Sequence, residues 1–428
     1  MNNQNASPAG VTFPDAVRVW ARIGCLSFGG PAGQIALMHR EIVEERQWLS
    51  EKEYLSALNF CMLLPGPEAM QLATYAGWKL HGVKGGLAAG LLFVLPGAFV
   101  VLALTMLYAS FGKLPVVDAV FYGIKAAVLA IVIEALLRVA KRALKGTSDW
   151  IIAGLAFLAL YAFAVPFPIV IIAAAVFGFW RSSGVREEHA GKLPSLGDIS
   201  RTAALWAAIW QVPLAALAMF LGPHHVLTEI GVFFSKLAVV TFGGAYAVLT
   251  YMAQAAVEQQ GWLSAPEMID GLALAETTPG PLILVTQFVG YFAGLREMGS
   301  TWGGIAGAVV TLWMTFAPCF LWIFAGAPYI EAIGKRPRLS GALAAITAAV
   351  VGVILNLSVW FGLHVLFGKV ERLDAGWFRP WIPDWVNLDW FALGLSLIAA
   401  LALLKFHLGI IRTLLLCAAL GAAWRLLL

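Results

Sequence analysis

Long apolar segments follow one another along the chain, and only short polar stretches separate them. A helix needs about 20 apolar residues to cross a hydrocarbon core about 30 Å thick, and most of these segments reach that length. The pattern predicts about 13 membrane segments. Their expected ranges are 17–38, 54–80, 85–111, 117–138, 150–164, 167–180, 202–222, 229–252, 267–293, 299–325, 339–367, 389–404 and 408–428.

Two stretches contain pairs of shorter segments. Residues 150–180 are divided at Pro166 and Pro168, and residues 389–428 are divided by Lys405 and His407. The halves of 150–180 are short for a membrane span. Each stretch is therefore expected to form a helical hairpin that enters the membrane or just crosses it.

The composition places the chain in a membrane. Hydrophobic residues make up 61% and charged residues 12%, with a mean hydropathy of +0.83, whereas a soluble domain is typically about 25% charged. Because so few charges cannot cover a globule with a solvated surface, the lipid bilayer must cover most of it. The sequence predicts an all-α polytopic membrane protein.

An internal repeat gives the domain organisation. Residues 27–67 align without gaps to residues 241–281, and the shared positions include Phe-Gly-Gly, Trp-Leu-Ser and Pro-Gly-Pro. Chance does not place three such triplets in one register twice. We predict a polar tail at 1–10, a first transporter repeat at 11–200, a connecting helix at 201–224 and a second transporter repeat at 225–428.

The basic loops predict that the two repeats have opposite orientations. In the first repeat the basic cluster follows segment 117–138, whereas in the second repeat it lies one crossing earlier, at 335–338. Because lysine and arginine favour the cytoplasmic side, this shift by one crossing indicates an inverted repeat. We expect the loops at 139–149 and 326–338 to be cytoplasmic.

A Pro-Gly-Pro triplet lies near the centre of one apolar segment in each repeat. The triplets are Pro65, Gly66 and Pro67, and Pro279, Gly280 and Pro281, and Thr278 directly precedes the second. All seven residues are predicted to line a substrate site. Proline breaks a helix, and the second proline of each triplet fits the first position of a new half-helix, whose positive end suits an anion. One triplet alone favours a simple kink, but two at equivalent positions favour a substrate site at the repeat interface.

The Phe-Gly-Gly triplets form a second pair of predicted breaks. Gly29, Gly30, Gly243 and Gly244 are expected to line the same site, with close helix packing through small residues as an equally good explanation. The Trp-Leu-Ser triplets favour architecture. Each tryptophan is expected to anchor at the membrane interface, and each serine to open a capping box with the glutamate three residues later.

Charged residues within apolar segments are the candidate binding groups, because such charges are costly and by default functional. Arg22 and Lys236 occupy the same repeat position, six residues before a Phe-Gly-Gly break, and are predicted to bind the substrate. Glu68 and Glu276 flank the two Pro-Gly-Pro triplets and are predicted to couple or gate transport. The alternative for each charge is a side chain that snorkels from near a helix end.

Signals of soluble enzymes are absent from the sequence. It contains no P-loop, GxSxG, HExxH or haem-attachment pattern, and its four cysteines lack metal-ligand spacing. We predict a protein that is not an enzyme and has no cofactor, metal or nucleic-acid partner. Lys125 and Glu134, which share segment 117–138, are expected to pair with one another or with other helices.

The paired motifs resemble those of the chromate ion transporter family. They comprise Phe-Gly-Gly-Pro at 28–31 with residues 47–78, and Phe-Gly-Gly at 242–244 with residues 261–291. The resemblance covers essentially the whole chain and matches the family's long, two-domain members. It implies a multi-pass protein of the bacterial inner membrane that exports chromate. Ala245 departs from the Pro31 of the first repeat, so the two breaks need not be chemically equivalent.

The main functional prediction is a secondary transporter that exports chromate, a tetrahedral oxyanion, and so gives chromate resistance. A membrane potential that is negative inside drives a dianion outward and contributes about 4.6 kcal/mol per 100 mV to its export. The alternatives are a carrier of sulfate or another oxyanion and, in a different class, a membrane-bound chromate-reducing oxidoreductase. A non-transporting assembly or sensor protein would have no reason to keep two broken helices. The sequence leaves the coupling ion and a homodimeric state open.

Overall fold

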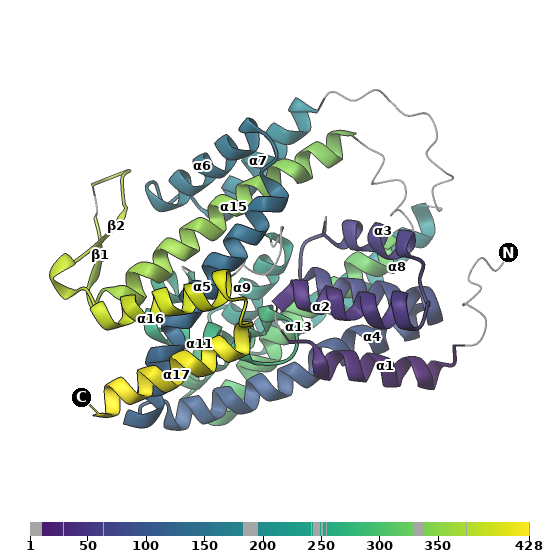
Figure 1. Ribbon diagram of the computed structural model, residues 1–428. Coiled ribbons are helices and arrows are strands. Elements are labelled where there is room, and N and C mark those ends of the chain that lie inside the picture. The colour runs from purple at the N-terminus through teal and green to yellow at the C-terminus, as the bar shows by residue number, and fades with distance from the viewer. Residues whose placement is uncertain are drawn as a thin grey trace. The chain divides into compact units, whose positions relative to one another are not determined.

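The computed structural model of the chain is almost entirely helical in the residues that it describes (Figure 1). Those residues are 11–28, 30–62, 64–182, 196–240, 242, 249, 251–253, 255–327, 337–373 and 375–427. Among them, six helices are long and apolar enough to cross a membrane, and three more are shorter and apolar. The predicted all-α polytopic membrane fold is confirmed, whereas the count of about 13 segments stays a prediction.

The elements of the first half and the linking helix follow the predicted segments closely. They are α1 (Phe13–Leu26), α2 (Gly30–His39), the π-helix η1 (Arg40–Glu45), α3 (Glu51–Cys61), α4 (Glu68–Phe111), α5 (Pro115–Ala143), α6 (Thr147–Tyr161), α7 (Phe167–Arg181) and α8 (Leu196–Phe220). The start signals are local. Thr12 caps α1, Ser50 caps α3, and Pro115 opens α5.

The second half repeats much of this order. Its elements are α9 (Val226–Val240), the π-helix η2 (Ala255–Gln259), α11 (Ala265–Thr277), η3 (Leu282–Leu284), α12 (Val285–Met298), α13 (Thr301–Gly326), α15 (Pro337–Leu366), η5 (Trp385–Asn387), α16 (Trp390–Ala400), the π-helix η6 (Leu401–Lys405) and α17 (Ile410–Leu427). A small antiparallel hairpin, β1 (Val370–Arg372) with β2 (Trp381–Pro383), separates α15 from η5.

Local backbone features recur at equivalent positions of the two aligned segments. The π-helices η1 and η2 lie at equivalent positions, and a left-handed residue stands two positions after the end of each, Gln47 (φ 52°) and Gly261 (φ 63°). In each repeat the N–H of the following tryptophan then donates to a carbonyl six residues earlier, at 2.8 Å for Trp48 and 2.9 Å for Trp262. The hairpins α6–α7 and α16–α17 likewise confirm the two predicted helix divisions.

The Trp-Leu-Ser triplets are structural, but the tryptophans differ from expectation. Ser50 and Ser264 each accept from the backbone N–H of the glutamate three residues later and donate to its carboxylate, which confirms both capping boxes. Trp48 and Trp262 were expected as interface anchors, yet both are buried within the protein. The closing hydrogen bond after each π-helix turns the indole inward.

Helix α4 is a folded-back hairpin rather than one straight helix. His81 and Gly82 have non-helical backbone angles, as expected between the predicted segments 54–80 and 85–111. The arms approach so closely that a Cβ on Gly77 would lie 2.3 Å from the carbonyl oxygen of Gly85. In the second half, α12 and α13 form the matching hairpin, which turns at Gly299 (φ 61°).

The chain forms two compact units. The first comprises residues 1–103, 184–245 and 278–340, and the second comprises 104–183, 246–277 and 341–428. In the first unit, α8, α9 and α12 pack on α13, whereas in the second α11, α16 and α17 pack on α5 (Figure 1). Each unit contains helices of both sequence repeats, so the units of packing do not coincide with the repeats. The opposite orientation of the repeats stays a prediction.

Candidate functional site

Three of the four predicted breaks lie in described residues, and all three interrupt helices. Helix α1 ends at Leu26 and α2 begins at Gly30, α3 ends at Cys61 and α4 begins at Glu68, and α11 ends at Thr277 before η3 begins at Leu282. Gly30, Gly66 and Gly280 have positive φ angles of 70°, 111° and 91°, a conformation that side chains other than glycine rarely adopt. Gly29, Gly243 and Gly244 lie outside the described residues.

The second proline of each triplet stands one residue earlier than predicted. Helix α4 begins at Glu68, immediately after Pro67, and Pro281 is the N-cap of η3 with an extended backbone (φ −63°, ψ 135°). A proline before the first helical residue loses no helical hydrogen bond, since its missing N–H would have no partner there. The triplets therefore end just ahead of new helix N-termini.

The first Phe-Gly-Gly break and the second Pro-Gly-Pro break meet within the first compact unit. The main-chain N–H of Gly280 donates to the carbonyl of Ser27 at 2.9 Å. The side-chain amide of Gln34, on α2, donates to the carbonyl of Gly280 at 2.6 Å. Breaks from the two repeated segments are thus joined by direct hydrogen bonds.

Buried glutamines satisfy a carbonyl at both Pro-Gly-Pro breaks. Gln71, in the first turn of α4, donates to the carbonyl of Pro65 at 2.6 Å, just as Gln34 donates to Gly280. Gln34 and Gln71 are 1% and 0% exposed, and among the described residues neither Oε1 atom has a hydrogen-bond partner. Buried acceptors without a hydrogen-bond partner are rare in a protein interior. At each of these breaks, one side-chain oxygen is therefore left without a donor among the described residues.

Each Pro-Gly-Pro glycine packs against the long helix of the other repeat. A Cβ on Gly97 of α4 would lie 2.2 Å from the carbonyl oxygen of Pro279, and a Cβ on Gly66 would lie 3.1 Å from the Sγ of Cys319 on α13. Gly97 and Cys319 each follow a proline inside their helix, Pro96 and Pro318. The packing is reciprocal, which is the relation that a two-fold axis between the repeats would produce.

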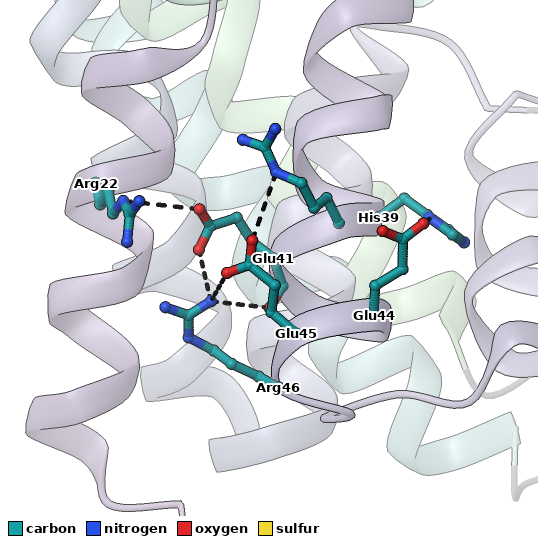
Figure 2. A network of polar contacts seen from close by, with 7 residues as sticks. Arg22, His39, Glu41, Glu44, Glu45 and Arg46 are labelled. Atoms are coloured by element: carbon teal, nitrogen blue, oxygen red, sulfur yellow. Dashed lines mark hydrogen bonds and ion pairs between the residues drawn. The ribbon is translucent and has the colours of Figure 1, made fainter.

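Arg22 has a partner that the sequence did not suggest (Figure 2). Its Nε lies 3.7 Å from Oε1 of Glu41, whose side chain is only 1% exposed. Arg46 holds the same carboxylate through Oε2 at 2.6 Å and also donates to the Glu41 carbonyl at 3.1 Å. In the described residues the terminal nitrogens of Arg22 make no hydrogen bond or ion pair, and its side chain is 57% exposed.

Lys236 has a different environment from Arg22. It is an exposed residue of α9 and makes no ion pair with any described residue. The repeat equivalent of Glu41 is Ala255, so the second half has no carboxylate at that position. The predicted proximity of Arg22 and Lys236 stays a prediction.

The predicted gating carboxylates stand at helix ends. Glu68 is half-buried as the first residue of α4, where a negative charge is favoured by the helix dipole. Glu276 is 5% exposed near the end of α11, in the second unit, and Thr278 after it is 4% exposed. Lys125 and Glu134 do not pair with each other, because Lys125 contacts Asp270 and Glu134 contacts Arg138.

Sequence reasoning missed Gln34, Gln71 and Glu41. The glutamines carry no charge, and within apolar segments only ionisable groups stand out in the sequence. Glu41 follows segment 17–38 and reads as part of a polar loop, whereas the π-helix η1 turns it inward. The described residues contain no group of three or more His, Cys, Asp or Glu that could hold a metal ion.

Comparison with known proteins finds one family along both halves. The family described as "Chromate transporter" matches residues 15–179 and 228–422. The "Chromate transport protein" of Cupriavidus metallidurans is 32% identical over 80% of this chain and 81% of its own length. That of Pseudomonas aeruginosa is 33% identical over 82% of this chain and 81% of its own length. No solved structure matches the chain.

Proposed function

Because the chain belongs to the chromate transporter family, we propose that it is a secondary transporter that exports chromate from the cytoplasm across a bacterial inner membrane. Its relatives are named transport proteins rather than enzymes, which agrees with the expectation that it is not an enzyme. The apolar helices make it a multi-pass membrane protein. Resistance to chromate would follow from export.

The observation that carries the proposal is the hydrogen-bonded meeting of two helix breaks from different repeats, between Ser27 and Gly280. Broken helices bring helix ends and unpaired backbone groups together in a membrane interior that otherwise tolerates neither. The N-termini of α4 and η3 follow these breaks directly. Their positive ends favour an anion without a metal ion.

Arg22 is the side chain best suited to hold the oxyanion. A guanidinium binds two oxygens of a tetrahedral anion at once, and the terminal nitrogens of Arg22 are open in the described residues. Glu41 neutralises its charge from the Nε side. We propose that Glu41 is the resident counter-ion of the empty site and that chromate competes with it for Arg22. Lys236 supplies a second positive charge from the other repeat.

The membrane potential sets the favoured direction. Moving two negative charges outward gains about 4.6 kcal/mol per 100 mV when the inside is negative, so export needs no co-substrate. Uptake of the same dianion would have to bring in more than two positive charges. Glu68 and Glu276, beside the Pro-Gly-Pro triplets, are proposed to gate the cycle through their protonation.

The test is counterflow of radiolabelled chromate in proteoliposomes, with unlabelled chromate or sulfate inside. Arg22→Gln is expected to reduce exchange roughly 10- to 100-fold, the effect of losing charge-assisted hydrogen bonds. Arg18→Gln is the matched control, because Arg18 is on the same helix, is 79% exposed and also pairs with a carboxylate, Asp15. Equal exchange by the two variants would rule out Arg22 as a binding residue. Counterflow with sulfate as fast as with chromate would favour the general oxyanion carrier.

A further inference from the structure

Three helices of the second compact unit bring ionisable side chains together away from the helix breaks. Lys125 of α5 lies 3.2 Å from Oδ1 of Asp270 on α11. The hydroxyl of Tyr108, near the end of α4, donates to Oδ2 of the same carboxylate at 2.6 Å. The side chains of Lys125 and Asp270 are 18% and 5% exposed. None of these residues belongs to the proposed oxyanion site.

Lys125 lies well inside α5, a helix that is long and apolar enough to cross a membrane. Lys125 is ten residues after Pro115, the first residue of α5, which corresponds to about 15 Å of helix in a hydrocarbon core of about 30 Å. A buried ion pair is costly to desolvate, and replacing it with apolar residues is often neutral or stabilising. Architecture alone therefore gives little reason to keep a lysine and an aspartate here.

At the repeat-equivalent positions of Lys125 and Asp270, the chain has uncharged residues. Asp270 corresponds to Ser56 in the alignment of the repeated motifs, and Lys125 in Ile-Lys-Ala-Ala-Val corresponds to Thr347 in Ile-Thr-Ala-Ala-Val. The same kinds of helix form in the first repeat at α3 and in the second at α15. Helix formation at these positions therefore requires neither charge.

We propose that Asp270, Lys125 and Tyr108 form a proton-exchange site that couples proton movement to transport of the oxyanion, an inference that rests on the proposed function. Oδ2 is held by Tyr108, whereas Oδ1 accepts no hydrogen bond among the described residues and faces Lys125. The proton adds to Oδ1, the carboxylate becomes a neutral acid, and the ion pair is lost. Release of that proton to water restores the pair.

Protonation changes the packing energy of two helices. A buried ammonium without its counter-charge costs several kcal/mol, so the protonated state disfavours the contact between α5 and α11, and the ionised state restores it. This gives the unit two states that a proton selects. Coupling to transport follows because α11 leads along the chain directly into Thr278 and the second Pro-Gly-Pro break.

Other charged groups act on the cluster from the same helices. Asp118 of α5 acts electrostatically on Asp270 and Tyr108, and Glu267 of α11 acts on Tyr108. Asp118 is exposed and lies seven residues, or two turns, before Lys125 on the same face of α5. Asp118 stands between the cluster and the start of the helix, and its negative charge favours the protonated form of Asp270.

The experiment measures chromate transport by the full chain in proteoliposomes, with the membrane potential clamped at zero and a pH gradient imposed in either direction. The wild type is expected to respond to the gradient several-fold, and Asp270→Asn is expected to lose that response and give a flat pH profile. Asp389→Asn is the matched control. Asp389 lies in the same unit and, like Asp270, accepts a hydrogen bond from a tyrosine hydroxyl, that of Tyr122 at 2.6 Å. Asparagine at this position can still cap α16.

A second variant guards against misfolding. Lys125→Thr combined with Asp270→Ser installs the residues of the other repeat and leaves no unpaired charge, so it should express normally and also lose the gradient response. Tyr108→Phe removes a donor to the ionised carboxylate and should move the pH profile to higher pH without abolishing coupling. A structural role would not move that profile.

The outcomes separate the two proposals. A wild type that ignores the pH gradient, or an Asp270→Asn variant that keeps the wild-type response, overturns the proton-exchange site. Absence of chromate counterflow in the wild type would instead defeat the proposed function, whatever the behaviour of the Asp270 variants.

Discussion

The two repeats share local backbone features but differ in the electrostatic surroundings of Arg22 and Lys236, which lie on α1 and α9. In the first repeat, Arg22 faces the buried Glu41 of the π-helix that follows. In the second, Lys236 is exposed and the position of Glu41 is taken by Ala255. The π-helix, the left-handed residue and the capping box are common to both. The two repeats therefore share these backbone features but differ in charge. Arg22 has a carboxylate partner, whereas Lys236 makes no ion pair with a described residue.

This difference suggests how one duplicated scaffold becomes directional. A substrate that competes with Glu41 meets a resident counter-ion in one half and none at the equivalent position in the other. The two cations would then hold the same anion with unequal strength. Four predictions test the features that the halves share and those in which they differ.

The largest effect is expected from Glu41→Ala. It removes the buried one of two carboxylates that contact Arg46, at 2.6 Å, while Glu45 remains at 3.2 Å. Loss of this charge-assisted contact, together with the ion pair to Arg22, should cost about 3 kcal/mol of unfolding free energy. Glu45→Ala, on the same π-helix but half-exposed, should cost less than about 1 kcal/mol. Denaturant unfolding in detergent measures both, and similar losses would show that Glu41 is not a buried counter-ion.

Gly97→Ala tests the reciprocal packing of the breaks. Its Cβ would lie 2.2 Å from the backbone oxygen of Pro279, so the substitution should cost about 1–3 kcal/mol and slow chromate exchange. The equivalent Cys319 already carries a side chain, so Cys319→Ala should be milder. Gly154→Ala on α6, where a Cβ meets nothing within 4 Å, is the control. An equally stable and active Gly97→Ala protein would contradict the tight contact.

Gln47→Gly should stabilise the protein by about 1 kcal/mol, since a non-glycine residue in the left-handed region costs about that much. Gln47 is exposed, so little side-chain packing is lost. In the other repeat, Gly261→Ala should destabilise by a similar amount, because its φ of 63° is strained for alanine although the space is open. Thermal unfolding of the two variants should shift in opposite directions.

The smallest effect concerns the capping box of α3. The backbone N–H and hydroxyl of Ser50 hydrogen-bond to Glu53 and lower the pKa of its carboxyl. The charge therefore stabilises the fold above the unfolded pKa of about 4.3, and this contribution is lost as the pH falls through the lowered folded value. Glu53→Gln keeps the capping geometry and should cost less than about 0.5 kcal/mol at neutral pH. A stability difference that persists at the lowest pH would show that the effect is not electrostatic.

The sequence by itself determined where helices begin, break and turn. Proline, glycine and the Ser-to-Glu spacing act within a few residues, so the breaks at Pro65–Pro67 and Pro279–Pro281 and the caps at Ser50 and Ser264 follow from local chemistry. Composition determined the membrane, because 12% charged residues cannot solvate a surface. Even here the position of the second proline differed by one residue, since the N-cap and the first helical position both tolerate a missing N–H.

Only the tertiary structure decided which groups meet. Ser27 bonds Gly280, and Lys125 pairs with Asp270, across long separations in sequence that no local pattern encodes. The sequence did not suggest a partner for Arg22, and the π-helix turns Glu41 inward to fill that place. The glutamines at the breaks gave no charge signal. Their role depends on orphaned carbonyls, and a carbonyl becomes orphaned only once the broken helices have been packed together.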